Sequence, residues 1–239
     1  MIDIHTHIIP NIDDGSKSIE ETFEMLKEAV DAGFTDIILT PHYIKEYYET
    51  DTNIREYWVK SIQEVLNNLQ IPINVYVGNE IYVSEDMDNL IFKNEVSCLN
   101  NSKYVLFELP MNSNITYLDQ ILFKINNLEK IPIIAHPERY NYFQKNIDLL
   151  EKLHKNGVLF QSNYASILGI YGEEAKKTVE KILKKKLVDF LGSDVHKQNT
   201  IYPSINKAKK KIVKIIGEKE FEKISNNNPR KIILDENII

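Results

Sequence analysis

Residues 1–15, MIDIHTHIIPNIDDG, combine a strand-like start with a set of polar side chains. Successive side chains of a strand point to opposite faces, so His5 and His7 share one face and the isoleucines and Thr6 take the other. We therefore expect a first strand that presents two imidazoles on the face where a metal ion could lie. Paired aspartates follow closely, at positions 13–14.

Six further strand-like runs follow, separated by amphipathic helical stretches. The helical period is clear between the first two runs, where Ser18 is a candidate N-cap, Glu21 stands three residues on, and Gly33 ends the pattern. Alternating β and α units predict an α/β fold with parallel strands, and seven runs predict closure into a barrel. No repeat or linker divides the chain, so we expect one domain over residues 1–239. The seven runs are residues 1–8, 34–42, 73–81, 104–110, 131–138, 158–164 and 188–196.

Composition excludes several classes of protein. A chain of 239 residues with 43% hydrophobic residues can bury a sizeable core. The net charge of −6 argues against nucleic-acid binding, and the basic run at 207–214 is interpreted as the solvated face of a helix. No stretch approaches the roughly 18 consecutive apolar residues of a membrane span, and the start lacks the pattern of a signal peptide. We expect a cytosolic protein without membrane insertion.

Two residues that often carry chemistry are interpreted as structural. Cys98 is the only cysteine, which excludes an internal disulfide and a thiolate cluster for zinc. No histidine stands beside it, so we interpret it as an incidental thiol. His154 lies near the end of a predicted helix, where a partly cationic imidazole suits the helix dipole, and we assign it no function.

Polar side chains gather where the predicted strands end. In barrels of parallel strands the active site lies at the carboxyl ends of the strands. One such residue alone is readily explained as a hydrogen-bonded loop residue, but chance would scatter histidines over the whole chain. Five of the six histidines fall at these ends. The residues at the strand ends are His5, His7, His42, Glu80, Glu108, His136, Asn163, Asp194 and His196.

The carboxylates in this set predict bound cations. Asp14, Glu80, Glu108 and Asp194 would repel one another strongly in one cavity unless cations neutralised them. Imidazoles and carboxylates together are good ligands for divalent transition metals, so the residues imply more than one metal ion. Without thiolates the set suits Mn²⁺, Fe²⁺ or Zn²⁺, and the residues alone do not choose among these.

Eight segments carry a resemblance to a known family. Together they resemble the PHP (polymerase and histidinol phosphatase) superfamily, and more closely the bacterial manganese-dependent protein-tyrosine phosphatases of the CpsB/YwqE/CapC type, found in capsule and exopolysaccharide gene clusters. The resemblance covers essentially the whole chain and implies a distorted (β/α)7 barrel. The segments are DIHTHIIPNIDDGSKSIEETFEML at 3–26, TPHY at 40–43, GNEIY at 78–82, FELPMN at 107–112, AHPERY at 135–140, QSNYASILG at 161–169, LGSDVH at 191–196 and NPRKI at 228–232.

The resemblance also implies a site for three divalent ions, manganese foremost. By this likeness one set of residues holds the first ion, a glutamate bridges from it to the second, and the second aspartate of the DDG segment reaches the third. The implied sets are His5, His7, Glu80 and Asp194; Glu80, Glu108 and His136; and Asp14, His42 and His196.

The activity that the resemblance implies is hydrolysis of phosphotyrosine by a metal-bound hydroxide. The implied substrate is the tyrosine-rich tail of a bacterial tyrosine autokinase, and the implied role is regulation of polysaccharide synthesis. Arg139 is the expected catalytic cation that grips the phosphoryl group, against the alternative of a surface salt bridge with Glu138. His196 or a metal-bound water is expected to protonate the leaving phenolate.

Some features leave alternatives open. Relatives commonly carry a second arginine after the SDVH segment, where this chain offers only Lys197, a point charge without bidentate geometry. Asn163 is a candidate to bond a ligand or water, whereas Tyr140 is equally well explained by packing. The alternative functions are a small-molecule phosphoesterase such as a histidinol phosphatase, and a catalytically silent binding module built on the same barrel.

Overall fold

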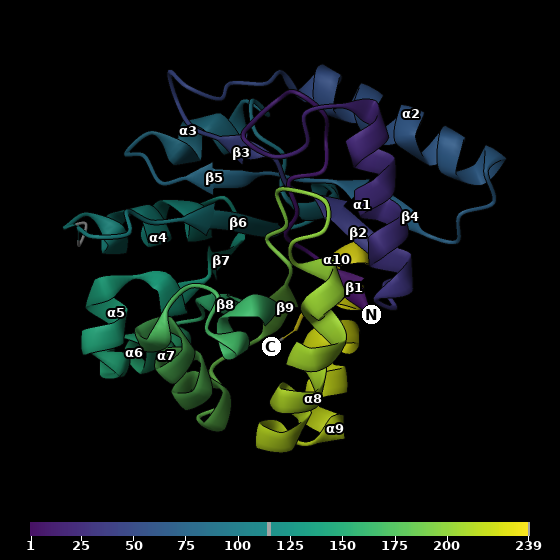
Figure 1. Cartoon of the computed structure of the whole chain (residues 1–239). Helices are drawn as coiled ribbons and strands as arrows, with labels where there is room; N and C mark the ends of the chain where they lie inside the picture. Colours follow the sequence, from purple (N-terminus) through teal and green to yellow (C-terminus); the bar gives the residue numbers. More distant parts are fainter. Residues whose placement is uncertain (114–115, 239) are drawn as a thin grey trace.

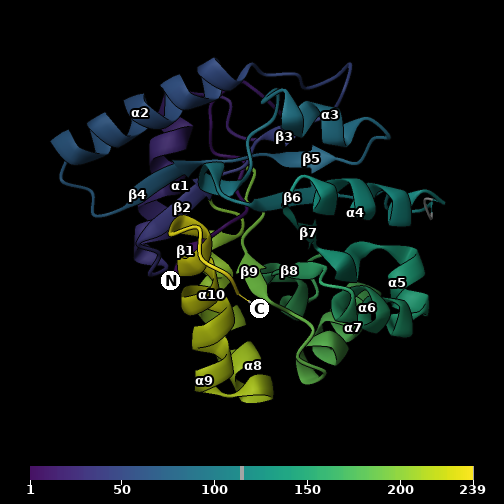
Figure 2. The ribbon, with the colours of Figure 1, turned by 180° about the vertical axis from the view of Figure 1, so that it is seen from behind.

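Parallel strands occupy the centre of the molecule and helices surround them (Figures 1 and 2). The computed structural model describes residues 1–113 and 116–238. Every strand pair in these residues is parallel. The strands are β1 (Ile2–Asp3), β2 (Asp36–Leu39), β3 (His42–Tyr43), β4 (Asn74–Val77), β5 (Glu80–Tyr82), β6 (Tyr104–Glu108), β7 (Ile131–Ala135), β8 (Leu159–Asn163) and β9 (Phe190–Gly192).

The strands form two parallel sheets that together curl into a barrel, and a hydrogen bond of 3.2 Å from the Glu80 amide to the Pro41 carbonyl lies at their junction. One hydrogen-bonded sheet has the order β1-β2-β4 and the other the order β3-β5-β6-β7-β8-β9. The ring closes where Thr6 bridges Val195, next to a hydrogen bond of 2.9 Å from the Asp194 amide to the His5 carbonyl. The predicted α/β barrel is therefore confirmed.

The strands are more broken than the sequence predicts. The runs at 34–42 and 73–81 are each split in two, which gives nine strands in the described residues instead of seven. Pro41 follows the first break point and has no amide hydrogen for a ladder. The first run was also predicted too long, because β1 ends at Asp3 and the segment that carries His5 and His7 continues beyond it.

The helices lie outside the strands; α1 to α7 stand between strands in the chain order, and α8 to α10 follow the last strand. Ser18 is confirmed as the N-cap of the first helix, since its Oγ accepts a hydrogen bond of 3.2 Å from the Glu21 amide. The helices are α1 (Ile19–Asp31), α2 (Thr52–Asn68), α3 (Met87–Phe92), α4 (Leu118–Asn127), α5 (Asn141–Lys145), α6 (Ile147–Lys155), α7 (Glu173–Lys184), α8 (Ile205–Ile216), α9 (Glu218–Glu222) and α10 (Asn228–Ile233). The predicted basic helix face lies on α8, where Lys207 and Lys210 are exposed and Ile212 is buried. None of the helices in the described part of the chain has the length and apolar character that crossing a bilayer requires.

The inside of the barrel is apolar at one end and polar at the other. The smaller of two hydrophobic clusters takes side chains from strands around the ring, such as Ile38, Leu106, Ile133 and Phe190. The larger cluster includes alternate residues of the same strands and the buried faces of the helices. On β6 this alternation places Glu108 on the same face as Leu106, one step nearer the carboxyl end of the strand. The carboxyl end of the barrel is therefore where inward-facing side chains become polar.

His154 shows what a histidine does away from that end. Its Nε2 lies 3.1 Å from both carboxylate oxygens of Asp189, and Oδ2 also accepts the amide hydrogen of Phe160. The hydrogen bond to Asp189 raises the pKa of His154 above its usual value. The stabilisation from this pair is fully present below the unfolded-state pKa of about 6.5 and is lost as pH rises through the higher folded-state pKa.

We predict that His154→Gln lowers the free energy of unfolding by about 0.5 kcal/mol at pH 6, the size expected for a partly exposed ion pair, and by less at pH 9. Urea unfolding of both proteins at the two pH values measures the difference. Lys155→Gln, in the same helical turn, is the matched control and should show no such pH dependence. An equal or larger effect of His154→Gln at pH 9 would contradict the assignment.

Candidate metal centre

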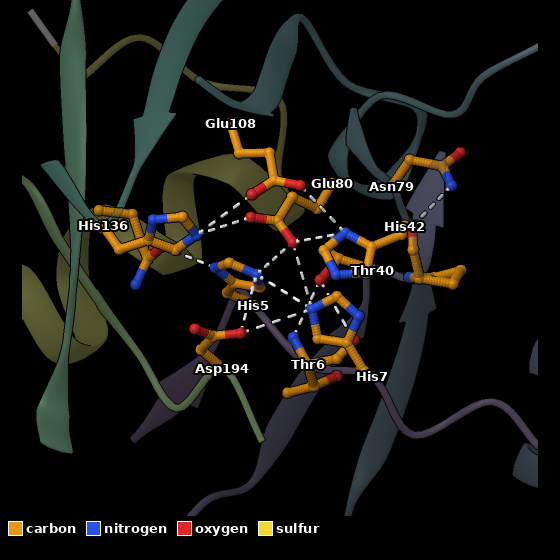
Figure 3. A network of polar contacts seen from close by, with 12 residues as sticks. His5, Thr6, His7, Thr40, His42, Asn79, Glu80, Glu108, His136 and Asp194 are labelled. Carbon is orange, nitrogen blue, oxygen red and sulfur yellow. Dashed lines mark hydrogen bonds and ion pairs between the residues drawn. The ribbon is translucent and has the colours of Figure 1, made fainter. Parts of the chain in front are cut away.

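All nine predicted metal ligands meet at the carboxyl end of the barrel. Figure 3 shows seven of them pointing toward one another from separate strand ends. Each side chain lies just past a strand or at one end of it. The nine residues are His5 and His7 after β1, Asp14 in the following loop, His42 at the start of β3, Glu80 at the start of β5, Glu108 at the end of β6, His136 after β7, and Asp194 and His196 after β9.

The loop after His7 folds back on that residue and so delivers Asp14. The Ser16 amide donates a hydrogen bond of 3.0 Å to the His7 carbonyl. A Cβ atom on Gly15 would lie 2.1 Å from that same carbonyl oxygen, so the third position of the DDG segment requires glycine. This close approach brings the Asp14 carboxylate to the opening of the barrel.

Two of the nine residues adopt a backbone conformation that is unusual for them. His136 has φ of 34° and Asp194 has φ of 54°, both in the left-handed region. Such a conformation costs on the order of 1 kcal/mol for a residue other than glycine and persists only where the surroundings enforce it. Both turns direct the side chain into the barrel mouth, so the strain accompanies the assembly of the site.

The most buried group comprises His5, His7, Glu80 and Asp194. One ligand atom from each lies within 4.8 Å of the others. Glu80 Oε2 is 3.0 Å from His5 Nε2 and 3.3 Å from His7 Nε2, and Asp194 Oδ1 is 3.6 Å from each of these nitrogens. The two Nε2 atoms themselves are 3.2 Å apart. This group is the set that the resemblance implies for the first ion.

The hydrogen bonding of His5 fits this group to a cation. His5 Nδ1 lies 2.7 Å from the amide oxygen of Gln161, which only accepts hydrogen bonds, so Nδ1 must carry a hydrogen. The neutral ring then presents a lone pair at Nε2 to the oxygens of Glu80 and Asp194. Lone pairs and negative charge facing one another in a dry site are unfavourable unless a cation or a proton lies between them.

The pKa values of these groups express the same conflict. Burial lowers the pKa of His5, but the charges of Glu80 and Asp194 outweigh burial and raise it to about 9. Burial likewise opposes the shift at His42, whose pKa Glu80 nonetheless raises to about 10. Burial and the neighbouring Glu80 charge raise the pKa of Glu108 to about 8. Protons therefore balance the carboxylates when no metal is bound, and divalent ions would displace them.

His42 links the buried group to two others. Its Nε2 lies 3.5 Å from Asp14 Oδ1, which is also 3.3 Å from His196 Nε2, and His7 completes this second group. Its Nδ1 lies 3.0 Å from Glu80 Oε2 and 3.4 Å from Glu108 Oε1, which forms a third group.

His136 adjoins the third group. Its Nε2 is 2.9 Å from Glu80 Oε1 and 4.0 Å from Glu108 Oε2. The groups therefore share residues more extensively than the three sets implied by the resemblance.

Among the described residues of the site, solvent exposure is greatest on one side. The side chains of His5, His7 and Glu80 are fully buried, whereas Asp14 is 53% exposed, His196 28% and Arg139 27%. A substrate can therefore approach past Asp14, His196 and Arg139.

Arg139 lies at this opening and contacts the site directly. Its Nη1 donates to Asp194 Oδ2 at 2.8 Å, and its guanidinium stacks over the ring of Tyr171 at 4.5 Å. The alternative salt bridge with Glu138 is wrong, because the buried Glu138 carboxylate accepts hydrogen bonds from the Asn163 amide and Ser166 Oγ instead.

Asn163 and Gln161 support the ligands from β8. Asn163 Nδ2 donates to Asp194 Oδ2 at 2.7 Å, and the Gln161 amide donates to Asn163 Oδ1 at 2.9 Å. From the sequence, Asn163 was expected to bond a ligand or water. Gln161 was not predicted, although it stands two residues before Asn163 and therefore lies on the same face of β8. Tyr140 is buried and its hydroxyl accepts the Leu109 amide hydrogen, so it packs and braces rather than lining the site.

The remaining candidates lie apart from this cluster. Lys197, considered as a substitute for a second arginine, is exposed. Cys98 is buried beside η1 (Leu99–Asn101), and burial raises the pKa of its thiol, which disfavours the reactive thiolate. The burial of Cys98 and the raised pKa of its thiol both argue against a thiol nucleophile.

The fold and the site together define a β/α barrel protein whose strand ends form a candidate centre for several metal ions. Comparison with known proteins gives the family. A family described as "Capsular polysaccharide synthesis, CpsB/CapC" matches residues 1–234. The chain belongs to this family.

Its relatives are similar over most of their length. CapC of Staphylococcus aureus is 38% identical over 82% of this chain and 77% of its own. The tyrosine-protein phosphatase CpsB of Streptococcus pneumoniae is 33% identical over 99% of each chain. A crystal structure from a study of Bacillus subtilis YwqE and S. pneumoniae CpsB, described as unique metal-dependent tyrosine phosphatases, has a TM-score of 0.91 at 29% identity and covers 100% of this chain and 96% of that one.

Proposed function

We propose that this chain is a metal-dependent protein-tyrosine phosphatase that hydrolyses phosphotyrosine and thereby regulates capsular or exopolysaccharide synthesis. The proposal is supported by membership of the CpsB/CapC family and by relatives that are named tyrosine-protein phosphatases. A histidinol phosphate phosphatase of Lactococcus lactis, with a TM-score of 0.60 at 16% identity over 90% of this chain and 93% of that one, shares the fold alone.

One observation carries the proposal. His5 Nε2, His7 Nε2, Glu80 Oε2 and Asp194 Oδ1 converge in a buried part of the barrel mouth, and the partly exposed Arg139 lies beside them. Four electron-pair donors at this spacing suit a divalent cation, and a cationic guanidinium at the opening suits an anionic ester. Phosphate-ester hydrolysis needs both features.

We propose three divalent ions, with Mn²⁺ preferred over Fe²⁺ or Zn²⁺. Such ions, when bound, lower the pKa of a coordinated water and neutralise charge on phosphoryl oxygens. The proposed ligands of the first are His5, His7, Glu80 and Asp194; of the second, Glu80, Glu108 and His136; and of the third, Asp14, His42 and His196.

The chain's own residues would then bind and orient the ester. Arg139 uses one N–H group, at Nη1, to donate a hydrogen bond to Asp194. Its other guanidinium N–H groups are available to donate to phosphoryl oxygens on the solvent side. The leaving group would be a tyrosine phenolate, which departs more readily than an alkoxide because the pKa of its conjugate acid is about 10.

Two roles were expected for His196, and they exclude each other. Its Nδ1 lies 3.0 Å from the Asp194 carbonyl oxygen and so donates there, which leaves Nε2 facing Asp14. A nitrogen that ligates a metal cannot also deliver a proton. We propose the ligand role, in which the phenolate takes its proton from water.

The substrate we propose is the tyrosine-rich tail of a bacterial tyrosine autokinase. A flexible tail suits a site that is buried on most sides and open only at Asp14, His196 and Arg139. The family's description places its members in capsular polysaccharide synthesis, which supports a role in that process.

We predict that the purified chain hydrolyses a phosphotyrosine peptide, that EDTA lowers the rate at least about 100-fold, and that Mn²⁺ restores it. Removal of the metal ions leaves Arg139 as the cation for the phosphoryl group and takes away the means of lowering the pKa of the attacking water. Released phosphate measures the rate. Cys98→Ser is the matched control for a thiol mechanism and should keep the wild-type rate within twofold.

Three outcomes would overturn the proposal. A strong preference for histidinol phosphate would favour the small-molecule phosphoesterase. Activity that survives EDTA but is lost in Cys98→Ser would favour a thiol mechanism. Activity unchanged in His42→Ala and Asp194→Ala would leave these residues without a catalytic part and would favour a binding module.

We predict that Arg139→Lys lowers kcat/KM for the peptide about 10-fold and Arg139→Gln about 100-fold, since the first loses the fork geometry and the second also loses the charge. Steady-state kinetics measure both changes. Metal content per chain should stay at the wild-type value in both variants. Wild-type kinetics in Arg139→Gln would show that this arginine does not hold the phosphoryl group.

A further inference from the structure

We propose that Asp13, which no ligand set includes, is the positioning residue that holds His7 and His42 in the geometry for binding cations. This inference deepens the proposed function, because it concerns the same centre. It rests on contacts of the Asp13 side chain, which is buried, with groups from two different strand ends. The adjacent Asp14 points into the opening instead, so the two aspartates of the DDG segment have separate tasks.

The Asp13 carboxylate accepts three hydrogen bonds, one from each of three segments of the site. Its Oδ2 accepts from His7 Nδ1 at 2.8 Å and from the His42 amide at 2.9 Å. Its Oδ1 accepts from the Gly15 amide at 2.9 Å. Because two backbone amides donate to it, the Asp13 carboxylate acts as a hydrogen-bond acceptor in this site.

The first contact selects the form of the His7 ring. A carboxylate accepts only, so Nδ1 carries the hydrogen and Nε2 presents its lone pair to the cluster, 3.3 Å from Glu80 Oε2. A carboxylate behind an imidazole also makes the far nitrogen a better electron donor to a metal. His7 belongs to two of the three groups, so both depend on this orientation.

The second contact anchors the start of β3. His42 follows Pro41 at the break between β2 and β3, and its amide hydrogen goes to Asp13 Oδ2. The His42 ring bridges two groups, with Nε2 toward Asp14 and Nδ1 toward Glu80. One carboxylate oxygen therefore sets the relative position of the His7 ring and the His42 backbone, two ligands that are 35 positions apart in the sequence.

The test is Mn²⁺ binding to the metal-free full-length chain, measured by isothermal titration with Mn²⁺ alone as the probe. We expect Asp13→Asn to weaken the affinity about 10-fold and Asp13→Ala about 100-fold, within the range for partners that orient ligands. The asparagine keeps one oxygen, which can still accept from His7 and His42, but it turns an NH2 group toward the Gly15 amide. Alanine leaves all three donors without an acceptor. Bound manganese per chain at limiting Mn²⁺ should fall in the same order.

Asp36→Asn is the matched control, because Asp36 is a buried aspartate that bonds Thr35, Asn74 and Tyr76 at the start of β2, the opposite end of the barrel. It should lower thermal stability without changing Mn²⁺ affinity. Wild-type affinity in both Asp13 variants, or an equal loss in Asp36→Asn, would overturn the inference. Since no substrate is used, these outcomes do not depend on whether the chain hydrolyses phosphotyrosine.

Discussion

Carboxylates and imidazole lone pairs repel one another at the mouth of the barrel, and the surrounding fold holds them together against this repulsion. Glu80, Asp194 and the Nε2 atoms of His5 and His7 meet in a buried part of the barrel mouth. Without metal ions, protons on the imidazoles balance the carboxylate charges, which is consistent with the raised pKa of His5. A site built this way is prepared for metal ions, because each proton it holds can be exchanged for a share of a divalent charge.

The barrel supplies the stiffness that such a site requires. Closure through Thr6 and Val195 brings the first and last ligand-bearing segments side by side, although they are separated by almost the whole chain. Other side chains then form hydrogen bonds with the proposed ligands. Gln161 bonds His5, and both Asn163 and Arg139 bond Asp194. Among the described residues, Asp14, His196 and Arg139 are the most exposed side chains at the mouth.

Much of this organisation was predictable from the sequence. Eight of the nine proposed ligands stand at predicted strand ends, which are visible as apolar runs followed by polar residues, whereas the place of Asp14 and the grouping into three sets came from the family resemblance. The splitting of the runs at 34–42 and 73–81 was missed, since each break depends on local backbone contacts that a hydrophobic pattern does not encode. Gln161 and Asp13 were missed for a related reason. A buried amide or carboxylate that bonds a ligand looks in sequence like any other polar residue, and only the fold shows which atom it faces.

We propose that these imidazoles and carboxylates coordinate several divalent ions at the barrel mouth. Anomalous X-ray diffraction from crystals grown with Mn²⁺ tests it most directly. We expect three manganese peaks, the deepest within coordination distance of His5 Nε2, His7 Nε2, Glu80 and Asp194. The absence of any peak among these side chains at saturating Mn²⁺ would contradict the account.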